Sequence, residues 1–472
     1  METPEEKKYK RMTGEPIERL IRQLAVPTII AMMVTAAYNI ADTYFVGTIG
    51  TEATAGVGLI LPIMNIIQAV GFFFGQGSGS FISRALGARH MENAAKMAAT
   101  GAVFSALFGL VLTVLGFVFN NGLLYILGAR EGLVDAKTVG YARDYLMFIL
   151  CGAPFMSLSC VLNNQLRFQG NALFAMIGLV SGAVLNCGLD PLFIYAFDME
   201  VRGAALATMI SQIISCSILY IGTLRSDNLK IRLRNFTPRI FYFKNICIGG
   251  LPSLFRQGLT SIATLSLNAA AGAAVAASLA EESIAAFSIV SKIMMLAYSA
   301  LIGFGQGFQP MCGFNYGAGR YDRVWAGWKY CVKVTTCFLI VLSALGYVFA
   351  GNIVAIFRDD PDVIAFGTIA MRMQCITFAF NSVTTMTNMM YQNMGRVVGA
   401  TLLAAARQGI MFIPTVLILP RLFPEPIWGV YLAQSAADIF AFAVALPLAL
   451  KVYREFKAVS FRKPQNTVDN RT

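Results

Sequence analysis

The stretch ATAGVGLILPIMNIIQAVGFFFGQGSGSFIS, residues 53–83, contains no acidic or basic side chain. A hydrocarbon core about 30 Å thick needs roughly 20 apolar residues in an α-helix, so this stretch is long enough to cross a membrane. It lacks the period-two alternation of apolar and polar residues that marks the strands of a membrane barrel. The stretch therefore predicts a transmembrane helix.

The same pattern recurs along the whole chain of 472 residues, of which 57% are hydrophobic and 13% charged. A soluble domain does not need so much apolar surface. Charge-free runs predict five further spans in the first half, at residues 23–41, 97–129, 145–166, 168–189 and 203–224. The second half predicts six, at 245–272, 284–310, 330–356, 364–390, 397–419 and 427–450. We therefore expect an all-α integral membrane protein with 12 transmembrane helices.

Basic residues gather before the first span, after the last span and between the two halves, whereas acidic residues gather in alternate loops. Cytoplasmic loops are enriched in Lys and Arg, so both termini are expected in the cytoplasm. The formal net charge of +12 is then an orientation signal, and no nucleic acid partner is expected. The predicted regions are a cytoplasmic tail, a first lobe, a basic cytoplasmic linker, a second lobe and a second tail, at 1–15, 16–224, 225–244, 245–450 and 451–472.

An internal repeat relates the two halves. Gly75-Gln76-Gly77 recurs as Gly305-Gln306-Gly307, and Gly87-Ala88 recurs as Gly317-Ala318, both at an offset of 230 residues. Two further matches, at an offset of 225, are Asn163–Gly170 with Asn388–Gly395 and Pro27 with Pro252. Because each unit has an even number of spans, the copies share an orientation and form parallel repeats around an axis along the membrane normal. A substrate cavity between two six-helix lobes is the expected consequence.

The chain resembles the multidrug and toxic compound extrusion (MATE) transporters over residues 15–450. The resemblance rests on the repeated glycine motifs and on three further stretches, which are Leu24-Ala25-Val26-Pro27, Asn39-Ile40-Ala41-Asp42-Thr43, and Gln309-Pro310 with Gly313 to Gly319. It implies a V-shaped pair of lobes that exports cationic or amphiphilic drugs by alternating access, in exchange for Na⁺ or H⁺. We expect a multi-pass monomer in the bacterial cytoplasmic membrane, active in antibiotic resistance, with no cofactor besides the coupling ion.

Two acidic residues, Asp42 and Asp190, directly follow the charge-free runs of the first and fifth spans. We expect both in the outer half of the bilayer, and an Asp at the centre of a membrane helix costs on the order of 3 kcal/mol on insertion scales. Asn39 precedes Asp42 by three residues and Asn186 precedes Asp190 by four, so each pair shares a helix face. Thr208, in the sixth span, could reach the same depth. Carboxylate, amide and hydroxyl oxygens suit Na⁺, and two neighbouring carboxylates could instead share H⁺.

The resemblance gives these residues a role. In the MATE branch that this chain most resembles, an Asp in helix one and the pattern Asn-x-x-x-Asp in helix five mark the N-lobe cation site. Asp42, Asn186 and Asp190 match that pattern, and Thr208 fits the contribution of helix six. The alternative is structural: such polar residues also join helices, and Asp190 before Pro191 could simply cap a helix end.

Other polar residues inside the spans are open to two interpretations. Asn163, Asn164, Gln76 and Gln306 could contact a substrate in the cavity or pack helices together. In the second half no acid matches Asp42, so we expect no cation site there. Asp438 is expected to form a structural charge pair, because a buried charge needs a partner. The candidate partners are Arg407 and Arg372, and the sequence assigns no role to Arg256 or Lys292.

These basic residues keep a second function open, the export of anionic lipid-linked saccharides by a transporter of the same two-lobe superfamily. Such a flippase would lack the paired acids of helices one and five. An ion channel is a third possibility, but no carbonyl filter motif occurs. An enzyme is not expected, because His90 is the only histidine and no HExxH or Cys-x-x-Cys motif is present.

Overall fold

The computed structural model describes residues 3–129, 135–225 and 229–462, which are almost entirely helical and contain no strand. Residues 226–228 of the predicted linker, and 1–2 and 463–472 of the predicted tails, lie outside the described residues. The helices of the first half are α1 (Pro4–Gly14), α2 (Ile17–Ile49), α3 (Thr51–Gly87), α4 (Met91–Val118), α5 (Asn120–Ile126), α6 (Ala136–Phe168), α7 (Ala172–Pro191) and α8 (Glu200–Leu224). Those of the second half are α9 (Ile240–Ala273), α10 (Ala280–Gly317), α11 (Tyr321–Val348), α12 (Ala350–Phe357), α13 (Pro361–Thr377), α14 (Asn381–Asn393), α15 (Val397–Ala405), α16 (Phe412–Ile418) and α17 (Pro426–Arg462).

These helices give the predicted 12 spans. Eleven helical segments of the described chain are long and apolar enough to cross a membrane, counting α13 with α14 and α15 with α16 as one segment each. The twelfth is α9, a helix of 34 residues that carries Lys244 at its start and Arg256 inside it. The prediction of an all-α, 12-helix membrane protein is therefore confirmed.

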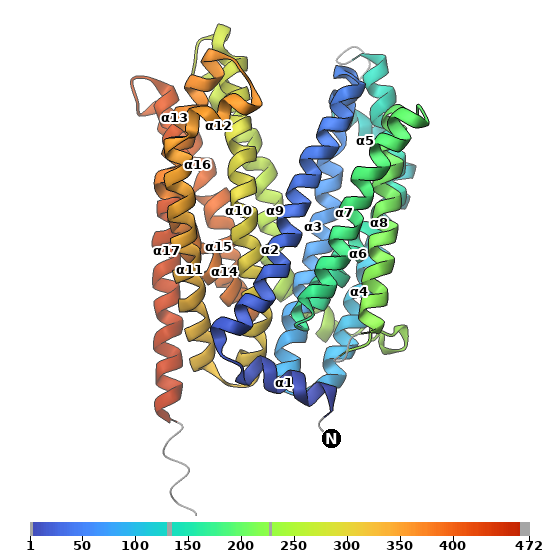
Figure 1. Cartoon of the computed structure of the whole chain (residues 1–472), viewed down its shortest axis with the longest axis vertical. Coiled ribbons are helices and arrows are strands. Elements are labelled where there is room, and N and C mark those ends of the chain that lie inside the picture. The colour runs from blue at the N-terminus through green and yellow to red at the C-terminus, as the bar shows by residue number, and fades with distance from the viewer. Residues whose placement is uncertain (1–2, 130–134, 226–228, 463–472) are drawn as a thin grey trace, which may run out of the picture.

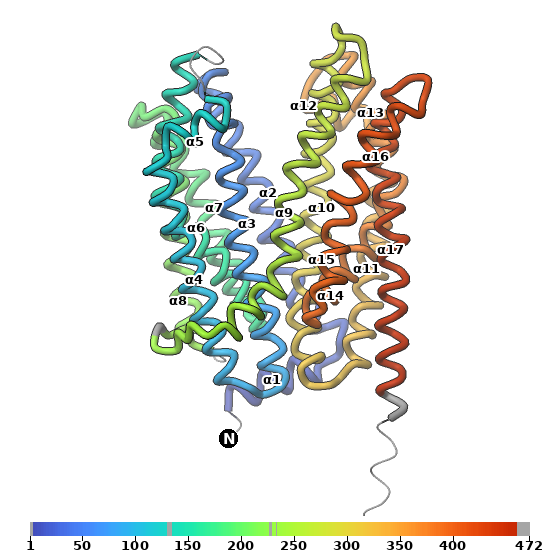
Figure 2. Tube along the Cα trace, turned by 180° about the vertical axis from the view of Figure 1, so that it is seen from behind, coloured from blue at the N-terminus to red at the C-terminus, as the bar shows by residue number. Residues whose placement is uncertain are grey.

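The helices form two lobes, α2–α8 and α9–α17 (Figure 1). The lobes lie close together at the end that holds α1 and spread apart toward the other end, and the view from behind shows the same arrangement (Figure 2). The buried apolar side chains follow this shape. One core at the α1 end draws residues from both lobes, including Leu24, Phe74, Phe308 and Phe314. Two further cores each belong to a single lobe, so the lobes are joined at one end only.

Glycines of the repeated motifs make the contact between the lobes. A Cβ atom on Gly77 of α3 would lie 2.3 Å from the carbonyl oxygen of Ile246 in α9, and one on Gly307 of α10 would lie 2.4 Å from Cα of Ala25 in α2. Gly87 and Gly317 behave alike, since an added Cβ would lie 2.1 Å from the carbonyl oxygen of Phe314 and of Arg84 respectively. Any larger side chain would force these backbones apart. The repeat thus encodes the close crossing of helices from opposite lobes.

The repeat also extends to a helix break that the sequence did not predict. The predicted spans 97–129 and 330–356 each end in a separate short helix, α5 or α12. The breaks fall at Phe119 (φ −102°, ψ 21°) and Phe349 (φ −95°, ψ 15°), which are again 230 residues apart. Neither break residue is itself a Gly or Pro, and hydrophobicity alone could not reveal the break.

The predicted N-terminal tail is an ordered helix. Thr3 and Glu6 form a capping box at the start of α1, which satisfies two backbone N–H groups that a helix end leaves free. On one side, Lys8 donates to Asn171 in the first lobe and the guanidinium of Arg89 lies over the Tyr9 ring. On the other, Asn315 and Arg320 donate to the carbonyl oxygens of Met12 and Thr13, at 3.0 and 2.8 Å. Helix α1 therefore bridges the two lobes.

Candidate functional site

Helices α7 and α8 bring three of the predicted cation-site residues together. The amide nitrogen of Asn186 donates to Asp190 Oδ1 at 3.3 Å and to Thr208 Oγ1 at 3.4 Å. All three side chains are buried, and Asp190 is not exposed at all. One turn of helix separates Asn186 from Asp190, so the amide can reach the carboxylate on the same face. Just beyond them the chain winds into a π-helical turn at Leu192–Ala196.

Asp42 reaches the same group from α2. Helix α2 packs against α7, which carries Asp190. No hydrogen bond joins Asp42 to Asp190 in the described part of the chain. Several oxygens here are buried and lack a donor, namely Asp42 Oδ1, Asp190 Oδ2, Asn186 Oδ1 and Ser211 Oγ. Buried polar atoms in native proteins nearly always have a partner, so this set has room for a cation or a proton. Oxygen ligands of these kinds suit a hard ion such as Na⁺.

The described residues contain no group of three or more His, Cys, Asp or Glu side chains able to hold a metal ion. The candidate cation site has two carboxylates, Asp42 and Asp190, and its other oxygens come from an amide and from hydroxyl groups. It therefore does not count as such a group.

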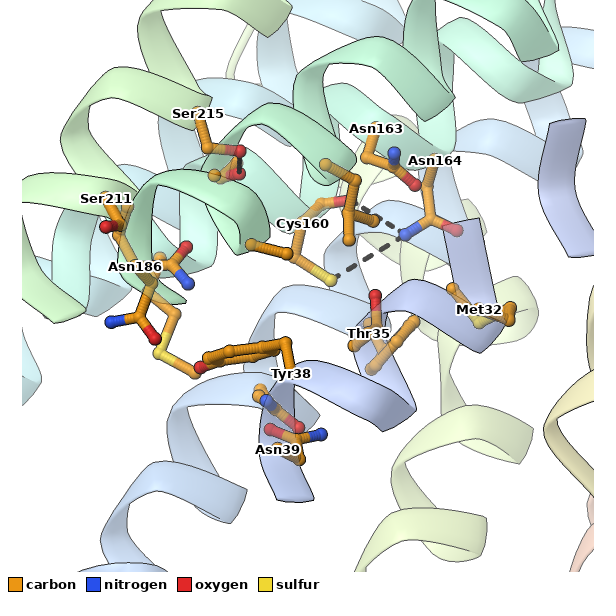
Figure 3. Close-up of a pocket in the computed structure, with 18 of the residues that line it drawn as sticks. Met32, Thr35, Tyr38, Asn39, Cys160, Asn163, Asn164, Asn186, Ser211 and Ser215 are labelled. Atoms are coloured by element: carbon orange, nitrogen blue, oxygen red, sulfur yellow. Dashed lines mark hydrogen bonds between the residues drawn. The ribbon is translucent and has the colours of Figure 1, made fainter. Parts of the chain in front are cut away.

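A cavity of about 190 Å³ opens beside this group. Asn186 and Thr208 line it together with Asn39, Asn163, Asn164 and Gln306. Figure 3 shows Asn186 and Ser211 at one end of the cavity, Asn163 and Asn164 at the other, and the ring of Tyr38 near the first end. Asn39 faces this cavity but is exposed, with no side-chain hydrogen bond to the cluster among the described residues.

Several neighbours of the two acids were not predicted from the sequence. Tyr38 lines the cavity within range of the charges of both Asp42 and Asp190, and Tyr145 lies beside Thr208. Ser211 lines the cavity as well. Helical spacing could have found two of them, since Tyr38 precedes Asp42 by four residues and Ser211 follows Thr208 by three. Tyr145 carries no such signal, because it comes from another helix.

At the other end of the cavity, a buried polar network joins the two lobes around Arg167, which is 1% exposed. Arg167 Nη2 donates to Asn164 Oδ1 at 2.7 Å and to Gln309 Oε1 at 3.2 Å, and Nη1 donates to Gln306. Gln76 closes the network, because its amide donates to Asn164 at 3.0 Å and accepts from Gln309 at 3.2 Å. Both repeated glutamines therefore meet in one network at the contact between the lobes.

This network changes the interpretation of the four predicted cavity residues. Asn164 and Gln306 have both roles, since they line the cavity and bind Arg167. Asn163 lines the cavity while donating to the carbonyl oxygen of Ala175 at 2.8 Å. Gln76 does not line the cavity, because its amide is used inside the network.

In the second lobe, both carboxylate oxygens of Asp438 accept hydrogen bonds. Arg407 Nε lies 2.9 Å from Asp438 Oδ1, Asn381 Nδ2 lies 2.8 Å from Oδ2, and Gln434 adds a third bond at 3.1 Å. Arg372 is not a partner of Asp438, which corrects that part of the prediction. Its guanidinium instead donates to the carbonyl oxygen of Tyr347 at 3.2 Å and lies over the Tyr347 ring.

Arg256 and Lys292, the two basic residues without predicted roles, differ in their surroundings. Arg256 is half-buried and lines a small cavity with Arg407 and Tyr298. Lys292 is exposed on α10. Asp438, the one acidic residue of the described second lobe that is fully buried, is therefore neutralised. In that lobe the partly buried Glu282, in the first turn of α10, keeps one oxygen without a donor, whereas in the first lobe Asp42 and Asp190 both do so in one group.

Comparison with known proteins agrees with this architecture. The chain is 26% identical over 429 residues to the multidrug export protein MepA of Staphylococcus saprophyticus, covering 89% of this chain and 91% of that protein. It is 25% identical over 434 residues to MepA of Staphylococcus aureus, covering 91% of this chain and 93% of that protein.

Solved structures give the same result. An outward-facing multidrug resistance transporter of the MATE family superposes with a TM-score of 0.89 at 26% identity, covering 98% of this chain and 100% of that one. A MATE protein in complex with MaL6 gives a TM-score of 0.89 at 27% identity, covering 96% and 99%. The model of the MatE family matches residues 27–192 and 258–417, which is most of both lobes. The chain therefore belongs to the MatE family of multi-pass membrane transporters.

Proposed function

We propose that this chain is a multidrug efflux transporter that exports small cationic or amphiphilic molecules in exchange for Na⁺ or H⁺. Its similarity to MepA and to MATE structures supports the efflux function. The observation that carries the ion-coupling proposal is the group of buried oxygens without donors at Asp42, Asn186 and Asp190. Thr208 completes the site, and Asn39 lies at its edge.

The contrast between the lobes supports placing ion coupling in the first one. Asp438 is bound by Arg407 and two amides, so protonating it or binding a cation there would have to break an ion pair. Asp42 and Asp190 have no basic partner in the described part of the chain. In this proposal the first lobe handles the ion, and the second lobe completes the cavity and the rocking motion.

The state of the molecule fits an alternating-access cycle. Basic residues at the α1 end support a cytoplasmic location for both termini in the bacterial inner membrane. The core shared by both lobes then closes the cytoplasmic side, and the lobes spread toward the outside. We propose that a single chain carries out this cycle, with no enzymatic step, no cofactor besides the ion, and no nucleic acid partner.

The direct test is efflux of ethidium from cells that express the wild type, Asp42→Asn or Asp190→Asn. Both variants are expected to lose at least about tenfold in efflux rate, because each removes a charge that the coupling ion must balance. Asp135→Asn is a matched control, since Asp135 is exposed and caps no backbone group with its side chain. Full efflux by both site variants would exclude this coupling site. The same assay in vesicles with an imposed Na⁺ or H⁺ gradient identifies the ion.

Export of an anionic lipid-linked saccharide is the second candidate, and the basic side chains of Arg167 and Arg256 at the two cavities are the observation that favours it. Deletion of the gene distinguishes the functions. A flippase of an essential lipid predicts loss of viability with unchanged drug sensitivity, whereas the proposed efflux function predicts viable cells with increased sensitivity.

A further inference from the structure

A groove of about 780 Å³ runs along the α1 end of the first lobe, apart from the ion site and the drug cavity. Helix α1, the first turns of α2 and the first turn of α7 form its walls. We call it the arginine groove, after Arg11, Arg19 and Arg22. Its apolar wall includes Val26, Leu173 and Phe174.

The three guanidinium groups are only partly neutralised. Glu15 is shared, since it lies 3.3 Å from Arg11 Nε and 3.3 Å from Arg19 Nε. Arg22 contacts only the backbone oxygen of Glu18, at 3.4 Å, among the described hydrogen bonds. Three positive groups and one carboxylate leave two net positive charges along the groove.

A helix end adds to this positive potential. The first residues of α7 line the groove, and the side chain of its N-cap residue, Asn171, makes no capping bond and instead accepts a bond from Lys8. The first backbone N–H groups of a helix point toward bound anions when no side chain caps them. Both the arginines and the helix end thus favour an anionic ligand.

The apolar wall of the groove is exposed, with Val26 at 53%, Leu173 at 55% and Phe174 at 41%. In a membrane such residues contact acyl chains, not water. The groove therefore places cationic groups at the membrane surface and apolar side chains directly beside them. A phospholipid has the complementary order, with a phosphate at the surface and acyl chains below it.

We infer that the arginine groove binds an anionic phospholipid of the cytoplasmic leaflet, with its phosphate at Arg19, Arg22 and the start of α7 and its acyl chain along Val26 and Phe174. The lipid would lie between α1, which bridges the lobes, and α2, which carries Asp42. Bound there, it would hold α1 in its bridging position. This site goes beyond the proposed drug and ion sites and does not depend on them.

The test measures lipid retention by the full-length protein. Delipidated protein is reconstituted with equal amounts of phosphatidylglycerol and phosphatidylcholine of the same chain length, and the retained lipids are counted by native mass spectrometry. Wild type is expected to retain phosphatidylglycerol preferentially. Arg19→Gln with Arg22→Gln should weaken this preference by about tenfold or more, because each basic residue near an anionic surface contributes on the order of 1 kcal/mol.

Two variants serve as controls. Arg225→Gln with Arg239→Gln removes two exposed arginines outside the groove and should leave the preference unchanged. Arg19→Lys with Arg22→Lys keeps the charge and should retain most of the preference, which shows that a loss in the Gln variant is not misfolding. Equal retention of both lipids by wild type, an unchanged preference in the Gln groove variant, or an equal loss in the control pair would each overturn the inference.

Discussion

At the residue scale, the fully buried carboxylates Asp438 and Asp190 differ in their hydrogen-bond partners. Asp438 has three donors, and Arg407 beside it is 14% exposed. Asp190 has a single amide donor and one oxygen with none. A satisfied carboxylate holds a structure together, whereas an unsatisfied one can take up an ion at little structural cost. This difference in partners supports the proposal that ion coupling lies in the first lobe.

The role of Asp438 as a structural ion pair is testable by a double-mutant cycle. Asp438→Asn leaves Arg407 buried without its counterion, and we expect the thermal stability of the purified protein to fall by an amount equivalent to about 3–5 kcal/mol. Adding Arg407→Gln should restore much of the loss, since neither charge remains. Arg372→Gln, which removes one bond to a carbonyl oxygen, should cost within about 1 kcal/mol. Additive losses in the double variant would contradict the pairing.

Asn186 tests the ion site without removing a charge. Its amide bonds Asp190 and Thr208 while its oxygen has no donor, so Asn186→Ala removes one ion ligand and the link between the two side chains. We expect the coupling-ion concentration at half-maximal ethidium efflux to rise by about tenfold, with little change in maximal rate. Asn245→Ala, an exposed amide at the start of α9, is the matched control. A lower maximal rate at an unchanged ion concentration would point to a structural role.

At the element scale, helix identity could be predicted from the sequence and helix junctions could not. Apolar length predicted every span, because the cost of burying charge in lipid acts on whole segments. The breaks at Phe119 and Phe349 depend on local packing that no hydropathy pattern records. Arg167 was missed for a related reason. The charge-free run of the fourth span ends at Leu166, and the acceptors that make Arg167 tolerable come from other helices.

The role of helix α1 as a bridge between the two lobes can be tested directly. Arg320 and Arg323 of the second lobe donate to the carbonyl oxygens of Thr13 and Glu15. Arg320→Ala with Arg323→Ala should therefore weaken the attachment of α1 to that lobe and leave only the bond from Asn315 to Met12 among those described above. A spin label at Lys7 on α1 is expected to become more mobile by electron paramagnetic resonance. Arg454→Ala, an exposed residue of α17, should leave the spectrum unchanged. An immobile label in the double variant would show that the two arginines do not hold α1, and that its first-lobe contacts and the Asn315 bond suffice.

At the scale of the whole molecule, the internal repeat places equivalent residues of both lobes at the contact between the lobes. Gly77 and Gly307 make equivalent approaches to α9 and α2, and Gln76 and Gln306 meet around one arginine. All of these contacts lie at the end where the lobes share a core. Opening that end would break them together, and packed interfaces of this kind switch between discrete states instead of deforming continuously.

Arg167 is therefore expected to control the balance between the two states. Arg167→Met removes bonds to Gln306 and Gln309 of the second lobe, and Gln306→Leu removes one of them from the other side. Loss of charge-assisted hydrogen bonds worth about 1.5–3 kcal/mol should shift the equilibrium by roughly tenfold or more toward separation of the lobes at the α1 end.

Spin labels at Glu92 and Asp322 can measure this shift, because these exposed residues occupy equivalent positions in the two lobes. In a variant without the nine native cysteines, double electron–electron resonance should show a new population at longer distance for both Arg167→Met and Gln306→Leu. Arg143→Gln, at an exposed position of the same helix α6, should keep the wild-type distribution. If Arg167→Met and Gln306→Leu keep it too, the glycine contacts and the shared core alone close the α1 end, and Arg167 serves only to line the cavity.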